Sequence, residues 1–146
     1  MKKEIWLDMD GTFVDLYGVS GWLPMLKAEK TTPYDLAKPL VDFSELETVL
    51  KKLQEKGFLI NIVSWTSKNS TQNYHEKVVK AKKSYLKRHL NVKFDKIDIE
   101  YYGTNKGLNR SGFLFDDEIQ NRQAWQGVAS TEKDLIKKLY TILERV

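Results

Sequence analysis

The stretch Ile5-Trp6-Leu7-Asp8-Met9-Asp10-Gly11-Thr12 decides the fold that we expect for this chain. An apolar run, from Ile5 to Leu7, leads into two carboxylates and then a glycine. An apolar run bounded by turn residues is typical of a buried strand that ends in a tight turn. We therefore predict a strand over residues 5–7, with Asp8 and Asp10 in the turn that follows it.

Further apolar runs predict the other strands. They cover residues 58–63, which end at Ser64; residues 97–102; residues 113–115, which end at Asp116-Asp117; and residues 127–129.

Helical patterns fill the gaps between these runs. Ser44-Glu45-Leu46-Glu47 has the form of a capping box, and Lys56-Gly57 is typical of a helix end. A second helix is expected around the apolar stripe from Tyr74 to Leu86, and a third from Thr131, capped by Ser130 or Thr131. Strands that alternate with helices predict an α/β layer fold with a mainly parallel sheet.

The composition predicts one folded domain, residues 1–146, and excludes several kinds of site. The absence of cysteine excludes disulfides and thiolate chemistry, and 2 histidines are too few for a multi-histidine metal centre. We expect both, His75 and His89, to be exposed and uninvolved. The net charge of +4 is a mild basic excess that favours anionic ligands. No apolar run is long enough for a signal peptide or a membrane span, so we expect a cytoplasmic protein with no membrane partner.

One region, residues 13–40, has no sustained hydrophobic period. It holds all 3 prolines of the chain, Pro24, Pro33 and Pro39. A loop of this length inside a compact domain usually has a purpose. We expect an insertion over one end of the sheet, a small lid in which Tyr17, Trp22 and Tyr34 either pack onto the core or stack against a ligand.

Polar side chains suited to phosphoryl chemistry end several of the predicted strands, namely Asp8, Ser64 and Asp116. Ligands bind at the carboxyl ends of the strands of an open parallel sheet, so these residues should meet at one rim. Asp8 and Asp10 are close enough to repel each other, which raises the pKa of one of them or recruits a cation such as Mg²⁺, an ion that prefers oxygen ligands. One carboxylate of such a pair can attack phosphorus while the other transfers protons.

These features resemble the signatures of the haloacid dehalogenase superfamily. Asp8-Met9-Asp10-Gly11-Thr12 is similar to the first signature, which implies that Asp8 is the nucleophile and Asp10 the general acid/base. Ser64 fits the second, a hydroxyl that binds the phosphoryl group, with Thr66 as the alternative. Asp116-Asp117 fits the fourth, an acidic pair that binds metal, with Asp116 as the direct ligand.

The third signature is a lysine that steadies negative charge. Lys106 lies shortly before the strand predicted at residues 113–115, where the deoxyribonucleotidases of this superfamily carry such a residue. Lys82 and Lys83 are the alternatives, but they lie in a helix whose many lysines indicate a solvated face. We therefore select Lys106.

The resemblance implies a three-layer, Rossmann-like fold with a small cap, and Mg²⁺ held by Asp8, the Asp10 carbonyl, Asp116 and Asp117. It implies a hydrolase of phosphate monoesters that works through an aspartyl phosphate, nearest to the 5′(3′)-deoxyribonucleotidases with a minimal cap. We expect a small phosphorylated substrate, such as a nucleotide. The alternatives are a polynucleotide end phosphatase, which makes nucleic acid the less favoured partner, and a noncatalytic phosphate-binding or regulatory module. The sequence indicates no oligomeric state.

Overall fold

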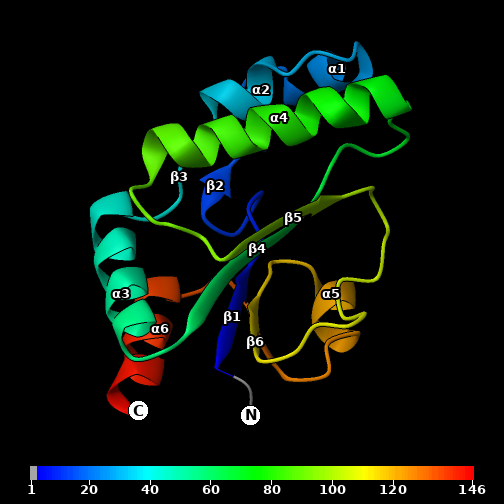
Figure 1. Ribbon diagram of the computed structural model, residues 1–146. Helices are drawn as coiled ribbons and strands as arrows, with labels where there is room; N and C mark the ends of the chain where they lie inside the picture. Colours follow the sequence, from blue (N-terminus) through cyan, green and yellow to red (C-terminus); the bar gives the residue numbers. More distant parts are fainter. Residues whose placement is uncertain (1–2) are drawn as a thin grey trace.

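The computed structural model describes residues 3–146, whose centre is a five-stranded parallel sheet (Figure 1). The strands follow the order β5-β4-β1-β6-β7, with β1 in the middle. Their bounds are β1 Glu4–Leu7, β4 Leu59–Trp65, β5 Lys96–Glu100, β6 Phe113–Phe115 and β7 Val128–Ser130. The strands and the parallel sheet predicted from the apolar runs are thus confirmed. Ser64 and Trp65, however, continue β4, because Ser64 is in register with Ile99 of β5 and Trp65 with Glu100.

Helices cover both faces of the sheet. Helices α3 (Phe43–Glu55) and α6 (Leu135–Glu144) lie on one face, and the short α5 (Ile119–Gln123) lies on the other (Figure 1). Helix α4 (Gln72–His89) crosses near the upper end of the sheet. The molecule therefore has the layered architecture that the alternation of strands and helices predicts.

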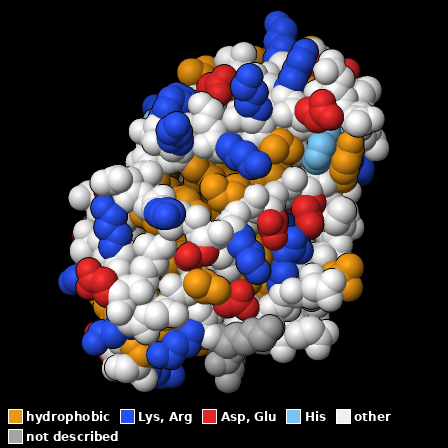
Figure 2. All heavy atoms as spheres, viewed as in Figure 1, with side chains coloured by type: hydrophobic (Ala, Val, Ile, Leu, Met, Phe, Trp, Pro, Cys, Tyr) orange, Lys and Arg blue, Asp and Glu red, His pale blue; other side chains and the backbone are white. Residues whose placement is uncertain are grey.

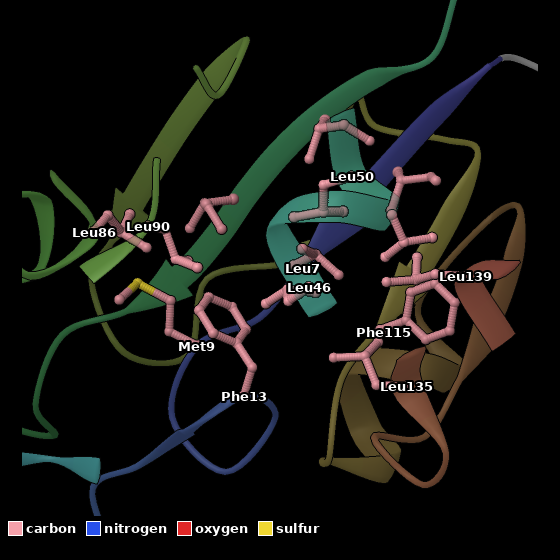
Figure 3. Close-up of a cluster of buried hydrophobic side chains, with 14 of the residues drawn as sticks. Leu7, Met9, Phe13, Leu46, Leu50, Leu86, Leu90, Phe115, Leu135 and Leu139 are labelled. Carbon is pink, nitrogen blue, oxygen red and sulfur yellow. The ribbon is translucent and has the colours of Figure 1, made fainter. Parts of the chain in front are cut away.

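The main core lies between the sheet and helices α3 and α6. Leu7 and Phe115 from neighbouring strands meet Leu46 and Leu50 of α3 and Leu139 of α6 (Figure 3). A smaller cluster on the opposite face contains Trp6, Val63, Leu114 and Trp125. Because β1 is buried on both faces, its apolar residues form a continuous run instead of alternating with polar ones.

Two of the expected helix starts are wrong. Helix α3 is capped by Asp42, whose side chain accepts hydrogen bonds from the main-chain nitrogens of Ser44 and Glu45, so Ser44 lies inside the helix. Helix α6 starts at Leu135 and not at Thr131, with Asp134 in the cap position, and Ser130 is the last residue of β7, paired with Phe115. The expected end of α3 at Lys56-Gly57 is confirmed, with Gly57 at φ 90°.

The insertion is a small folded unit. It contains helices α1 (Trp22–Lys27) and α2 (Thr32–Leu36), and its strands β2 (Val14–Asp15) and β3 (Lys38–Pro39) pair antiparallel. Both helices lie beside α4 (Figure 1).

Hydrogen bonds connect this lid to the rest of the molecule. The Tyr74 hydroxyl donates to the carbonyl of Lys30 at 2.7 Å, and Tyr34 shares a hydrogen bond of 2.6 Å with the Ser67 hydroxyl. Tyr34 and Tyr74 also pack together in one apolar cluster. The lid is therefore joined to α4 and to the loop before it. Within residues 3–146 no helix has the length and apolar character needed to cross a membrane.

Candidate active site

The three carboxylates Asp8, Asp116 and Asp117 meet at the carboxyl end of the sheet. Asp8 follows β1 and Asp116 follows β6, and these strands are neighbours. The main-chain nitrogen of Asp8 donates to the carbonyl of Phe115 at 3.0 Å, so the pairing continues to the first residue of the turn. One carboxylate oxygen from each of the three residues lies within 4.8 Å of the other two. The convergence expected from the strand ends is thus present in the fold.

The turn after β1 is held together around the carbonyl of Met9. This oxygen accepts hydrogen bonds from the main-chain nitrogens of Thr12, Phe13 and Val14, each at 3.1 Å. Gly11 has φ 83°, and a Cβ there would lie 2.3 Å from Oδ2 of Asp117. Only glycine allows both this conformation and this close approach of the acidic pair.

Thr12 links the carboxylates of the turn and the acidic pair. Its hydroxyl lies 2.9 Å from Oδ2 of Asp8 and 3.4 Å from Oδ1 of Asp117. This hydrogen bond orients the Asp8 carboxylate, which is 5% exposed.

Lys106 reaches the carboxylates from the loop between β5 and β6. Its Nζ donates to Oδ1 of Asp8 at 3.0 Å and to Oδ2 of Asp116 at 2.8 Å. Burial lowers the pKa of Lys106, but the two carboxylates outweigh burial and raise that pKa to about 12. Of the three lysines considered for this role, the one selected from the sequence touches both strand-end aspartates.

A second lysine, Lys82, also lies in the site. The expectation that it belongs to a solvated helix face is wrong, because it is 1% exposed, whereas Lys83 is exposed as expected. Its Nζ donates to the Asp10 carboxylate, to the Ser64 hydroxyl at 2.7 Å and to the carbonyl of Trp65 at 2.6 Å. Each carboxylate of the turn thus has its own lysine, since Lys106 pairs with Asp8 and Lys82 pairs with Asp10.

Asp10 does not belong to the cluster of three carboxylates, and its side chain pairs with Lys82. Removal from water raises the pKa of Asp10, and the charge of Lys82 opposes this shift without cancelling it. A carboxyl group with a raised pKa is suited to donate a proton. The expected role of Asp10 as a metal ligand concerned its main-chain carbonyl and stays a prediction.

The acidic pair after β6 is held by its own loop and by α5. The main-chain nitrogen of Glu118 donates to Oδ1 of Asp116 at 2.9 Å, and Nδ2 of Asn121 donates to Oδ2 at 3.1 Å. Arg122 donates to the carbonyl of Asp116 at 2.9 Å. These contacts leave Asp116 fully buried with both oxygens hydrogen-bonded.

The protonation of the pair reflects its crowding. Burial and the nearby Asp8 raise the pKa of Asp116 to about 6. Burial and a hydrogen bond with Asp8 raise the pKa of Asp117 to about 8. The positive charge of Lys106 therefore does not offset the burial of these carboxyl groups and their mutual repulsion. Three converging carboxylates with one cation between two of them are a donor set that fits a hard divalent cation such as Mg²⁺.

The hydroxyls of Ser64 and Thr66 both line the cavity beside Asp8. The Ser64 hydroxyl accepts from Lys82, and the Thr66 hydroxyl shares a hydrogen bond of 2.7 Å with Nδ1 of His75. His75, expected to be exposed and uninvolved, is partly buried and stacks on Tyr101 with ring centroids 3.6 Å apart. His89 is exposed, as expected, and lies against Phe43 and Tyr85.

A cavity of about 530 Å³ opens between the carboxylates and the lid. Its lid side carries Leu16, Tyr17, Trp22 and Leu26, and its sheet side carries Trp65. Tyr17 and Trp22 pack edge to face with ring centroids 5.0 Å apart. On the face of the molecule seen in Figure 2, hydrophobic side chains gather in the middle, with charged side chains around them.

Three residues that touch the site's carboxylates were not selected from the sequence, namely Thr12, Lys82 and Asn121, although Lys82 was considered as an alternative to Lys106. Lys82 had a usable signal, because it lies four residues after Val78 and three before Tyr85, on the buried stripe of α4. Thr12 is part of the quoted turn, but its hydrogen bond to Asp8 depends on the turn geometry. Comparison of the chain with protein-family models finds no match, and no curated protein matches it.

Proposed function

We propose that this chain is a magnesium-dependent phosphomonoesterase in which Asp8 accepts the phosphoryl group. The observation that carries the proposal is the position of Lys106, whose Nζ lies 3.0 Å from Asp8 and 2.8 Å from Asp116. A lysine that joins the carboxylates of two strand ends supplies positive charge where a transferring phosphoryl group needs it. The resemblance of Asp8-Met9-Asp10-Gly11-Thr12 to the first haloacid dehalogenase signature supports the same assignment.

The proposed reaction has two steps. An Asp8 oxygen bonds to phosphorus while the bond from phosphorus to the leaving oxygen breaks, and Asp10 gives its proton to that oxygen. Asp10 then takes a proton from water, which bonds to phosphorus and breaks the Asp8–phosphorus linkage, releasing inorganic phosphate. Its raised pKa supports the first role, and its contact with Lys82 stabilises the carboxylate needed for the second.

Asp8, Asp116 and Asp117 would hold Mg²⁺, assisted by the Asp10 carbonyl. When bound, the ion would neutralise phosphoryl oxygens and orient the phosphate for in-line attack. Lys106 and the Ser64 hydroxyl would bind the remaining phosphoryl oxygens.

The cavity supports a substrate whose alcohol portion carries an aromatic group. Its aromatic walls, Trp22, Tyr17 and Trp65, lie within one space of about 530 Å³ with Asp8. That space suits a mononucleotide better than a polymer end, because the lid covers it. A nucleoside monophosphate is therefore the proposed substrate class.

The test is hydrolysis of an aryl phosphate with and without Mg²⁺. We expect turnover that requires Mg²⁺ and that Asp8→Asn lowers by at least about 10⁴-fold, since the nucleophile is lost. Asp35→Asn, an exposed carboxylate of the lid, is the matched control and should retain full activity. Acid-quenched enzyme should carry a hydroxylamine-sensitive phosphoryl group only when Asp8 is present. Retained turnover in folded Asp8→Asn protein would contradict the assignment.

A substrate series separates the alternatives. Deoxynucleoside monophosphates, glycerol phosphate and 3′-phosphorylated oligonucleotides are compared at two salt concentrations. Preference for the mononucleotides supports the proposal. Preference for oligonucleotides that falls steeply with salt would instead identify a polynucleotide end phosphatase, and binding of phosphate without turnover would identify a noncatalytic module.

A further inference from the structure

The side chain of Arg110 ties the loop that carries Lys106 to strand β5. Its Nη2 lies 2.9 Å from Oδ2 of Asp98 and 2.8 Å from Oε2 of Glu100. Its Nη1 donates to the main-chain carbonyl of Lys106 at 3.2 Å. The Arg110 side chain is 9% exposed, and its guanidinium carbon lies over the ring of Trp6, 5.2 Å from the ring centroid. Arg110 therefore joins the backbone at Lys106 to the outermost strand of the sheet.

A second set of contacts leads from Glu100 back to Lys106. The other carboxylate oxygen of Glu100, Oε1, accepts from the Thr104 hydroxyl at 3.1 Å. The Trp65 indole donates to the carbonyl and the hydroxyl oxygens of Thr104 at 3.2 and 3.1 Å. Nζ of Lys106 lies 5.0 Å from the centroid of the Trp65 ring. The two sets of contacts meet at Glu100 and both lead to Lys106, one to its main chain and one to its side chain.

The segment between β5 and β6, residues 101–112, has no helix or strand to fix it. It includes Gly103, Asn109 and Gly112 with positive φ, so its path depends on tertiary contacts. Of the contacts described above, only the Arg110 bond acts on the main chain at Lys106. A lysine in place of Arg110 could not make these contacts, because a guanidinium presents several donors in a fixed plane and an ammonium does not.

We propose that Arg110 is a positioning residue that holds the Lys106 ammonium between Asp8 and Asp116. Its kinetic consequence rests on the proposed function, whereas its structural consequence does not. Without Arg110 the loop would lose the contact to the main chain at Lys106, and the ammonium would no longer be held between the two carboxylates.

The structural test is chemical labelling of lysines, read by mass spectrometry, and needs no activity. In the natural protein Lys106 and Lys82 are 2% and 1% exposed, so both should resist acetylation. In Arg110→Met we expect Lys106 to become reactive while Lys82 stays protected, and Arg88→Met, which removes an exposed arginine, should change neither. Arg110→Lys should give the same result and serves if Arg110→Met does not fold. Continued protection of Lys106, or exposure of both lysines together, would overturn the proposal.

The kinetic test is a double-mutant cycle. Arg110→Met should lower kcat for an aryl phosphate by about 10²-fold with little change in KM, because displacement of a catalytic group by about 1 Å costs that much. In a Lys106→Met background the same substitution should have no further effect on kcat. Equal effects in both backgrounds would show that Arg110 acts independently of Lys106. Absence of turnover in the natural protein would refute the proposed function while leaving the labelling result to decide the role of Arg110.

Discussion

Lys82 and Asp10 form an ion pair inside the site, in which the Lys82 side chain is 1% exposed. Removal of one partner of a buried pair leaves an uncompensated charge and costs about 3–5 kcal/mol. Asp10 is 14% exposed, so water reduces this cost and we expect Lys82→Met to lower the free energy of unfolding by about 3 kcal/mol at neutral pH. Urea unfolding measures the change. Lys83→Met, one residue away but exposed, is the control and should be nearly neutral. Equal losses in the two variants would contradict the buried pair.

Asp117 should make the stability of the metal-free protein depend on pH. Its pKa rises from the ordinary 3.8 to about 8, so the folded protein retains a proton that the unfolded chain has released between these values. Stability from this source is complete below the unfolded pKa and disappears as pH rises through the folded one. We expect the thermal midpoint, measured in a chelator, to fall between about pH 4 and about pH 8. Asp117→Asn should weaken that fall, and Mg²⁺ should reverse it in the natural protein only. An identical slope in Asp117→Asn would exclude this carboxyl as the source.

The residues of the site differ in how far the sequence predicts them. Asp8, Asp116 and Lys106 were placed by their positions at or before strands, and the parallel sheet brings them together. Lys82 was not selected, because α4 has many lysines, and Lys82 differs from the others only in its position on the buried stripe of the helix. Arg110 has no sequence signal, since its contacts with Asp98 and Glu100 of β5 depend on the path of the loop over residues 101–112.

At the scale of elements, the start of α3 shows what local patterns can and cannot decide. Ser44 and Asp42 both precede the apolar stripe, and the sequence motif favours Ser44. The structure assigns the cap to Asp42, which accepts from two main-chain nitrogens. Strands, by contrast, were predicted within a few residues, because buried parallel strands are continuous apolar runs. Helix ends depend on which of several acceptors reaches the free N–H groups.

The cap can be tested by paired substitutions. Asp42→Ala should lower the free energy of unfolding by about 1 kcal/mol, because it leaves main-chain donors of the first turn without a protein acceptor. Ser44→Ala should have little effect or stabilise slightly, since alanine favours a helix interior. Chemical unfolding of both variants measures the difference. The reverse order of stability would restore Ser44 as the cap.

At the scale of the whole molecule, the site is built where the lid, the sheet and α4 meet. The lid was predicted as an insertion, but its two helices were not, because each is too short to show a hydrophobic period. Its position depends on contacts with residues far along the chain, such as Ser67 and Tyr74. The chemistry of the rim could therefore be predicted, whereas the shape of the cavity above it could not.

The aromatic wall of the lid should set the affinity for the substrate. Trp22→Ala should raise KM for a deoxynucleoside monophosphate by about 10-fold with kcat little changed, because base stacking contributes about 1–3 kcal/mol. KM for glycerol phosphate should not change. Leu36→Ala, at an exposed position of the same lid, is the control. Steady-state kinetics with both substrates measure the effect, and equal changes for the two would contradict a stacking role.

The hydrogen bonds from Tyr34 and Tyr74 that fasten the lid bear on how ligands come and go. A lid held by these two bonds would not swing aside, so ligands would reach the cavity through an entrance that stays open. Ligands would then exchange at rates set by diffusion through that entrance instead of by a hinge, as in enzymes whose flaps must swing aside. Turnover in such an arrangement would be governed by the bond-breaking steps, and inhibitors shaped for the entrance would bind without reorganising the protein.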